Sequence, residues 1–378
     1  MSLLESPPDA VVRIDGRPYL YFAGTSYLGL QGRPEVIRAA CEAAERFGLG
    51  SANSRTAFGT TPPLLQMEQA AAATFGAEAA FCFASGWMGG HILIGSLDAD
   101  RVVALVDEHS HFSLFEAART IGRPPVVFRH ADPDDLRAKI QKHLGVGQRP
   151  LVLSDGVFAA TGDLAPVDRY LEVLREYPDS SLLLDDAHGL GVLGPRGRGT
   201  FEHFGIAADE VNTARAPLPC PALWCCGTLS KAVGGYGGVI LSDARFIEQL
   251  QADSPYMAGV SPPPAPVAAA TARALELIAS EPELRERLSA NARRLKDGLR
   301  AMGFSVSESP TPIARLVIGT AERMRRIQRE LMNRGIAVAY MSNYAGLDPE
   351  GALRLAVFAT HTDAMIDRLF EELRQVAT

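Results

Sequence analysis

The stretch Gly227-Thr228-Leu229-Ser230-Lys231-Ala232-Val233-Gly234-Gly235 places one lysine between hydroxyl residues and glycines, directly after the apolar run Ala222-Leu223-Trp224-Cys225-Cys226. A lysine amine is a useful nucleophile near neutral pH only when burial, neighbouring charges or a Schiff base lowers its pKa. Thr228 and Ser230 offer hydroxyl donors to a phosphate, and the glycines let the backbone approach a bulky group closely. Most lysines are solvated surface charges, so this pattern needs a second element that agrees with it.

That second element is Ser181-Leu182-Leu183-Leu184-Asp185-Asp186-Ala187-His188-Gly189, an apolar strand that ends in two carboxylates and a histidine. In an open α/β sheet, ligands bind beyond the carboxyl ends of the strands, so we expect Asp185 and His188 to face a cleft. A carboxylate there keeps a pyridinium nitrogen protonated, which makes the ring of pyridoxal 5'-phosphate (PLP) an electron acceptor. An aspartate that merely caps the next turn is a common alternative. Together with Lys231, the pattern favours PLP.

A competing motif follows directly, because Gly189-Leu190-Gly191-Val192-Leu193-Gly194 fits the G-x-G-x-x-G pattern of dinucleotide-binding sites. In such sites the first glycine comes immediately after the strand, whereas polar or small residues intervene here. The next residues, Pro195-Arg196-Gly197-Arg198-Gly199, do not open a helix that could receive a pyrophosphate. We therefore interpret this segment as a glycine-rich loop and keep an NAD-dependent oxidoreductase only as a distant alternative.

Composition narrows the class of protein. The chain has 378 residues, 47% hydrophobic and 21% charged, which is typical of a globular protein of about two domains. A net charge of −7 disfavours nucleic acid and anionic membrane surfaces as partners. The sequence has no apolar run long enough to span a bilayer, and its first residues lack the features of a secretory signal.

The cysteines and histidines give no sign of a metal site. Five cysteines are present, an odd number without C-x-x-C spacing, and the adjacent Cys225 and Cys226 are expected in a buried strand. No histidine pair has a carboxylate at the spacing of metal ligands. We expect a cytoplasmic protein with reduced thiols and no metal.

Short apolar runs alternate with helical segments along the chain, which predicts an α/β fold with a mostly parallel sheet. After a hairpin around Asp15-Gly16, strands are expected at 79–83, 101–106, 125–128, 150–154, 181–185, 222–226 and, as an edge strand, 239–241. Helices are expected at 34–47, 63–75 and 133–144. A change of composition at 253–266 predicts a hinge and one long helix to about Met302.

The remainder is expected to form a smaller α+β domain, with strands near 304–308, 313–319, 336–340 and 353–358 and helices at 321–334 and 363–376. We therefore divide the chain into an N-terminal arm or small-domain segment (1–45), a large PLP-binding domain (46–255), and a hinge helix with a small C-terminal domain (256–378).

Two further segments have the composition of ligand sites. Ser85-Gly86-Trp87 follows the strand at 79–83 and precedes a helix, an arrangement that aims free backbone N–H groups and the positive end of the helix dipole at a phosphate. His111 follows the strand at 101–106. A histidine in that position can stack on an aromatic ring or cap the next helix, and the residues alone leave both interpretations open.

With these residues in hand, the chain resembles the fold-type I PLP-dependent enzymes, and specifically the α-oxoamine synthase family, which includes 8-amino-7-oxononanoate synthase and serine palmitoyltransferase. The resemblance covers roughly residues 15–376. Its most specific parts are Tyr27-Leu28-Gly29-Leu30, Asp185-Asp186-Ala187-His188-Gly189, Gly197-Arg198-Gly199 and Gly227-Thr228-Leu229-Ser230-Lys231.

The resemblance implies a role for each matched residue. Lys231 would be linked covalently to PLP, Asp185 would pair with the pyridine nitrogen, His188 would bond the phenolic oxygen, and His111 would stack on the ring. The phosphate would be held by Ser85, the backbone of Gly86 and Trp87, Thr228 and Ser230, with Ser261 reaching the partner subunit's phosphate in a homodimer. Arg354 would grip the substrate carboxylate.

The activity implied is that of an acyltransferase, which condenses a small amino acid with an acyl thioester, with acyl-CoA as the expected donor. Decarboxylation to an α-amino ketone usually follows. Another fold-type I reaction, catalysed by an aminotransferase or by a lyase or aldolase, is the alternative. Four departures concern the acyl donor: Thr25 replaces an asparagine near the substrates, Ala159 replaces a serine, the N-terminal helix is nearly absent, and 213–224 looks inserted.

Overall fold

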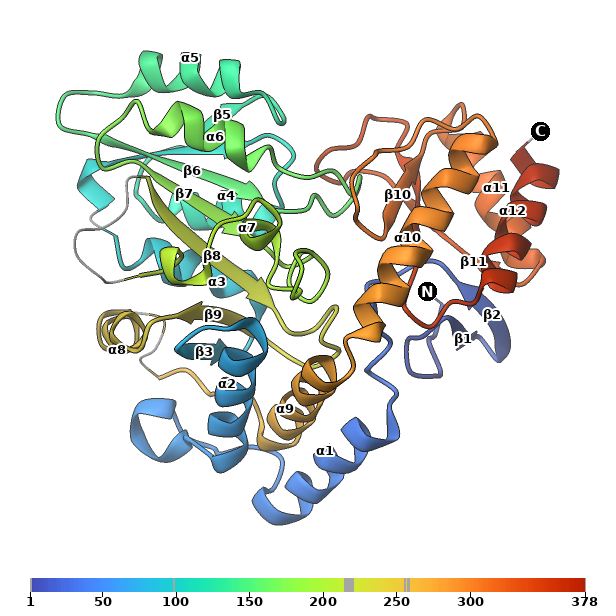
Figure 1. Cartoon of the computed structure of the whole chain (residues 1–378), viewed down its shortest axis with the longest axis horizontal. Helices are drawn as coiled ribbons and strands as arrows, with labels where there is room; N and C mark the ends of the chain where they lie inside the picture. The colour runs from blue at the N-terminus through green and yellow to red at the C-terminus, as the bar shows by residue number, and fades with distance from the viewer. Residues whose placement is uncertain (1, 98, 214–220, 255, 257–258, 378) are drawn as a thin grey trace.

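A seven-stranded sheet forms the centre of the larger lobe in the computed structural model (Figure 1), which describes residues 2–97, 99–213, 221–254, 256 and 259–377. Across the sheet the strands are β3 (Ala79–Phe83), β9 (Gly238–Ser242), β8 (Ala222–Thr228), β7 (Ser181–Asp185), β6 (Arg149–Asp155), β4 (Val102–Asp107) and β5 (Val126–Phe128). Neighbours are parallel from β8 to β5, whereas β9 is antiparallel to β8 and β3. The expected mostly parallel α/β sheet is confirmed.

Both faces of this sheet are buried, which explains why its strands are continuous apolar runs rather than alternating ones. In β7, Leu182 and Leu184 pack on one face with α5 (Pro133–His143), α6 (Val167–Leu174) and α7 (Thr200–His203). Leu183 packs on the other face with α3 (Gly89–Ile94), α4 (Phe112–Arg119) and α8 (Ala244–Asp253). The polar residues that end β7 and β6 therefore emerge at one edge of a rigid layer.

The two lobes are joined by helices whose number differs from the prediction. The long helix expected up to Met302 is two helices, α9 (Ala265–Ser280) and α10 (Glu283–Ala301), which Figure 1 shows running from α1 toward the small lobe. The break lies at Pro282: proline has no N–H for the helical ladder and disfavours helical backbone at Glu281. Helices α1 (Pro34–Phe47) and α2 (Pro62–Phe75) pack beside α9.

The small lobe is built from both ends of the chain. Strands β10 (Ile313–Leu316), β13 (Ala352–Ala356) and β12 (Ala339–Met341) form an antiparallel sheet. The N-terminal hairpin of β1 (Val11–Ile14) and β2 (Arg17–Tyr21) joins β11 (Ile336–Ala337) in a second sheet, and α11 (Ala321–Asn333) and α12 (Asp363–Ala377) complete the lobe. Residues 304–308, expected as a strand, belong to no strand or helix.

One further expectation was wrong. The strand at 239–241 is not an edge strand, because β3 pairs antiparallel with β9 and lies outside it. Parts of the expected hinge at 253–266 and of the stretch 213–224 fall outside the described residues. Within the described ranges, no helix combines the length and hydrophobicity needed to cross a bilayer.

Candidate active site

A cavity of about 250 Å³ opens at the carboxyl ends of β6, β7 and β8. This is the edge at which open α/β sheets place their ligands. The cavity brings together residues from five separate stretches of the chain: Ser85, Gly86, Trp87, His111, Ser113, Asp155, Val157, Ala159, Asp185, Ala187, His188, Thr228, Ser230 and Lys231. Nine of the twelve site residues predicted from the sequence are in this set.

Lys231 is the end of a chain of buried hydrogen bonds. Its Nζ lies 2.8 Å from His188 Nε2, and His188 Nδ1 lies 2.7 Å from the Tyr27 hydroxyl. Arg354 Nη2 donates to the same hydroxyl at 3.3 Å. The Tyr27 hydroxyl can accept from Arg354 and donate its own hydrogen to His188 Nδ1, and the imidazole hydrogen is then on Nε2, where a neutral Lys231 amine accepts it.

The charge states agree with this direction of donation. Burial, followed by the positive charges of Lys231 and Arg354, lowers the pKa of His188 well below its ordinary value, so the imidazole is neutral. Burial also lowers the pKa of Lys231, against the opposing effect of Asp185 and Asp155. Its amine therefore loses a proton more readily than a surface lysine, as a nucleophile or a base requires.

Two carboxyl groups share the floor of the cavity, since Asp155 and Asp185 are register partners on β6 and β7. Burial and the neighbouring Asp185 raise the pKa of Asp155 well above its usual range. Burial raises the pKa of Asp185 as well, but the positive charge of Lys231 and a 3.0 Å hydrogen bond from Ala187 N–H oppose that rise. The proton is therefore favoured on Asp155, which leaves the carboxylate on Asp185.

His111 also lines the cavity, where the capping interpretation is confirmed and the stacking interpretation stays a prediction. It is the N-cap of α4, where its Nδ1 accepts from Ser113 N–H at 3.2 Å, and its backbone N–H donates to Asp155 at 3.0 Å. Its ring meets the Trp87 ring edge-on at 5.2 Å between centroids. His111 is thus fixed in place beside the cavity by three neighbours.

Hydroxyl groups and backbone amides form one part of the cavity lining. Thr228 Oγ1 lies 2.8 Å from Ser230 Oγ, and Trp87 N–H donates to Ser85 Oγ at 3.4 Å. Gly86 packs closely against Thr228. A Cβ built on Gly86 would come 2.9 Å from Thr228 Cβ, so a side chain there would force these two segments apart. Such a donor-rich, close-fitting part of the cavity suits a phosphate.

The three other predicted residues lie outside the cavity. Arg354 is buried next to it on β13, with its Nε donating to Ala159 O at 2.8 Å and its Nη1 to Gly24 O at 3.1 Å. Thr25 is half-buried, and its carbonyl accepts from Tyr27 N–H. Ser261 is exposed and lines a separate cavity with Arg55.

Sequence reasoning assigned no role to Tyr27, although it belongs to a quoted motif, or to Asp155, which directly follows the strand expected at 150–154. The signal for Asp155 was the polar end of an apolar strand, the same signal that identified Asp185. Tyr27 had no comparable signal, because an aromatic residue in an apolar run predicts core packing. Only the contact with His188, far away in the sequence, reveals its position.

The glycine pattern at 189–194 forms a closed loop rather than a dinucleotide site. Gly191 N–H donates to Gly197 O at 2.8 Å and Gly199 N–H to Leu193 O at 3.0 Å, so the loop returns on itself. The helix that follows, α7, has four residues. The structure therefore lacks the long helix N-terminus that would hold a pyrophosphate at this position.

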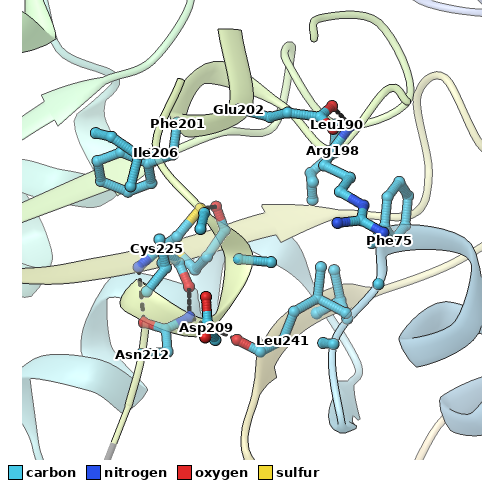
Figure 2. Close-up of a pocket in the computed structure, with 17 residues that line it drawn as sticks. Phe75, Leu190, Arg198, Phe201, Glu202, Ile206, Asp209, Asn212, Cys225 and Leu241 are labelled. Carbon is cyan, nitrogen blue, oxygen red and sulfur yellow. Dashed lines mark hydrogen bonds between the residues drawn. The ribbon is translucent and has the colours of Figure 1, made fainter. Parts of the chain in front are cut away.

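A second cavity, of about 300 Å³, lies between α2, β8, β9 and the segment 198–212 (Figure 2). Its lining is mainly apolar, with Phe75, Phe201 and Leu241 among its side chains. Figure 2 shows Asn212 bonded to Cys225, where Nδ2 donates to the carbonyl at 2.7 Å. None of the predicted site residues contributes to this cavity, so its chemistry is separate from that around Lys231.

Comparisons with known proteins agree with the site. A family model described as aminotransferase class I and II matches residues 19–373. An 8-amino-7-oxononanoate synthase of Pseudomonas putida is 36% identical over 374 residues, 99% of this chain and 92% of the relative. A serine palmitoyltransferase of Sphingobacterium spiritivorum is 33% identical, over 99% of this chain and 90% of its own length. The chain belongs to the α-oxoamine synthase family.

Solved structures place this α-oxoamine synthase in the same fold. A serine palmitoyltransferase from S. paucimobilis, bound to PLP and myriocin, matches with a TM-score of 0.89 and 27% identity, covering 100% of this chain and 92% of that one. The family resemblance and the fold-type I architecture inferred from the sequence are therefore confirmed. The enzyme is a PLP-dependent transferase.

The residues of the cavity fit this cofactor. The cavity is lined by the Asp185 carboxylate, by hydroxyl and amide donors, and by Lys231. Asp185 would hold the pyridine nitrogen, and Ser85, Gly86, Trp87, Thr228 and Ser230 would hold the phosphate. Among the residues that the structure describes, no cluster of histidine, cysteine and carboxylate side chains could bind a metal ion.

Proposed function

We propose that this α-oxoamine synthase condenses a small amino acid with an acyl-CoA, with decarboxylation, to give an α-amino ketone. A bond forms between the α-carbon of the amino acid and the acyl carbonyl carbon, and the carbon–sulfur bond of the thioester breaks. The thiolate leaves and takes up a proton as free CoA, while the carboxylate leaves as carbon dioxide. The observation that supports this best is the buried Lys231 amine, 2.8 Å from a neutral His188 and in one cavity with Asp185.

PLP, when bound, supplies an electron-accepting ring that stabilises negative charge at the α-carbon. Lys231 Nζ, with its lowered pKa, is suited to take the α-proton and to return it later. His188 Nε2–H is held toward this amine by the hydrogen bond from Tyr27, and the same N–H is suited to the phenolic oxygen of the cofactor. The carboxylate of Asp185 favours the protonated ring nitrogen.

Arg354 is the group that we propose for the carboxylate of the amino acid. A guanidinium has five N–H donors. Three bond to Ala159 O, Gly24 O and the Tyr27 hydroxyl, which leaves one N–H on each terminal nitrogen. Two parallel N–H groups match the two oxygens of a carboxylate. Thr25, next to Gly24, would then lie beside the bound substrate.

We also propose that the enzyme works as a homodimer in the cytoplasm, with Ser261 reaching the partner subunit's phosphate. Large apolar side chains are exposed on the segment between α1 and α2, where Phe58 is 90% exposed and Leu49 is 81% exposed. A second copy would bury them. The described cysteines are free thiols, which suits a reducing compartment. Light scattering tests the homodimer, and cell fractionation tests the cytoplasmic location. Limited proteolysis tests the division of the chain into the domains 1–45, 46–255 and 256–378.

Incubation of the purified enzyme with glycine, alanine or serine and a series of acyl-CoA donors tests the reaction. Free thiol should appear with the loss of the amino acid, and only when both substrates are present. Thiol release without an amino acid would be plain hydrolysis. Formation of a keto acid without thiol release would indicate an aminotransferase instead, and binding of NADH followed by fluorescence would revive the oxidoreductase alternative.

A further inference from the structure

The tip of the hairpin formed by β12 and β13 reaches from the small lobe to the edge of the Lys231 cavity. Residues 342–351 connect the two strands, and β13 carries Arg354. At this tip the Tyr344 ring lies 6.1 Å from the His111 ring and 5.8 Å from the Phe112 ring, between centroids. Gly346 lies against His109, since a Cβ built on it would come 3.2 Å from His109 Cγ. The tip therefore contacts the turn that holds His111.

The backbone of the tip fixes the direction of Tyr344. Asn343 has φ of 55° and Gly346 of 82°, both in the left-handed region that tight turns use. In the same turn, Leu347 N–H donates to Tyr344 O at 3.2 Å. A half-buried aromatic ring on such a turn, in contact with two other rings, has little freedom to move away.

The hydroxyl of Tyr344 lies within electrostatic reach of the charged groups of the site. Burial, followed by the negative charge of Asp155, raises the pKa of Tyr344 to about 12, and Arg354 and Asp185 also lie within electrostatic reach. The phenol is therefore neutral at physiological pH. The Tyr344 ring lies beside the ring of His111, and its hydroxyl also lies within electrostatic reach of Tyr27.

These positions limit the space around a bound amino acid. A carboxylate on Arg354 and an α-carbon near Lys231 Nζ would place the amino acid close to Tyr344, because Tyr344 lies within electrostatic reach of Arg354 and Asp185 and its ring lies beside His111, which lines the cavity. We propose that Tyr344 is a specificity-determining residue, whose ring restricts the substrate to amino acids with small side chains. This inference rests on the proposed function, because it assumes that the substrate is an amino acid held by Arg354.

Equilibrium binding to the PLP-loaded enzyme tests the inference without any acyl donor. Glycine, serine and leucine are titrated separately, and the change in the visible spectrum gives each dissociation constant. Tyr344→Ala should lower the leucine-to-glycine ratio of these constants at least tenfold, since even one methylene in a closed pocket is worth roughly 10- to 200-fold. Tyr344→Trp should act in the opposite direction and raise the serine-to-glycine ratio, so the test survives if the alanine variant folds poorly.

Tyr340→Ala is the matched control. Tyr340 lies on β12 of the same hairpin, but its hydroxyl donates to Glu350 O and its ring stacks under Arg325, away from the cavity. Tyr340→Ala should leave the leucine-to-glycine and serine-to-glycine ratios unchanged. Ratios within twofold of the parent in the Tyr344 variants, with glycine binding intact, would overturn the role of Tyr344. Failure of the proposed function looks different: amino acids bind as described, but no acyl-CoA releases thiol.

Discussion

Replacement of Arg354 by alanine tests the most specific part of the substrate site. The side chain is 6% exposed, and two of its five N–H donors remain for a ligand after its bonds to Ala159 O, Gly24 O and the Tyr27 hydroxyl. Each hydrogen bond to a charged group contributes about 1.5–3 kcal/mol, and paired bonds are not fully additive. We therefore expect Arg354→Ala to lose about 2–4 kcal/mol of amino-acid binding, or roughly 30- to 1,000-fold in Kd.

Titration of the PLP-loaded protein with alanine, followed by visible absorbance, measures this loss. The content of PLP should stay near that of the parent, because no cofactor-binding atom has been removed. Arg354→Lys should lie between the two, since a lysine keeps the charge but lacks the planar pair of donors. A Kd within twofold of the parent for Arg354→Ala, at equal PLP content, would refute this assignment.

Arg294→Ala provides the control for removal of an arginine. Arg294 lies on α10 and pairs with Asp367 at 2.6 Å on the surface, where such a pair contributes about 0–1 kcal/mol. It should leave the Kd for alanine unchanged. A similar rise in Kd for both variants would show that binding depends on overall charge rather than on Arg354.

Three other changes test the site and its support. Lys231→Ala should abolish the visible absorbance of lysine-linked PLP, and unchanged colour would assign the cofactor to another lysine. Asp186→Ala leaves the Thr200 N–H and hydroxyl, now bonded at 2.7 and 2.6 Å, without their acceptor, so stability should fall by about 2–4 kcal/mol in urea unfolding. Burial lowers the pKa of Lys296 from 10.5 to about 8, so the unfolded chain binds more protons between those values and stability rises with pH there. Lys296→Met should lack that rise in stability. The same change of Tm between pH 8 and pH 10 in the parent and in Lys296→Met would contradict the prediction.

Local sequence was sufficient for most of the fold, because the elements of the large sheet are strongly patterned. The helices Pro34–Phe47 and Pro62–Phe75 begin at prolines and end before glycines, and β7 is an unbroken apolar run. The failures have local or tertiary causes. Pro282 divides the long helix, and the position of β9 inside the sheet depends on pairing with β3, a strand far away in the sequence.

For the site, the sequence by itself determined the chemistry of the strand ends. Lys231, Asp185 and His188 stand out because charged residues directly after buried strands have few structural uses, and parallel strands bring such ends to one edge. The residues at that edge were therefore sufficient to predict the PLP cofactor.

Tertiary structure alone decided how these groups are tuned and enclosed. The proton positions depend on Tyr27, which contacts His188, and on Arg354, which bonds Tyr27, and the carboxylate on Asp185 follows from its neighbour Asp155. Tyr344 meets His111 only because the small lobe packs its hairpin against the large one. A pKa or a pocket wall depends on distances between residues remote in the chain, and sequence periodicity contains no such distances.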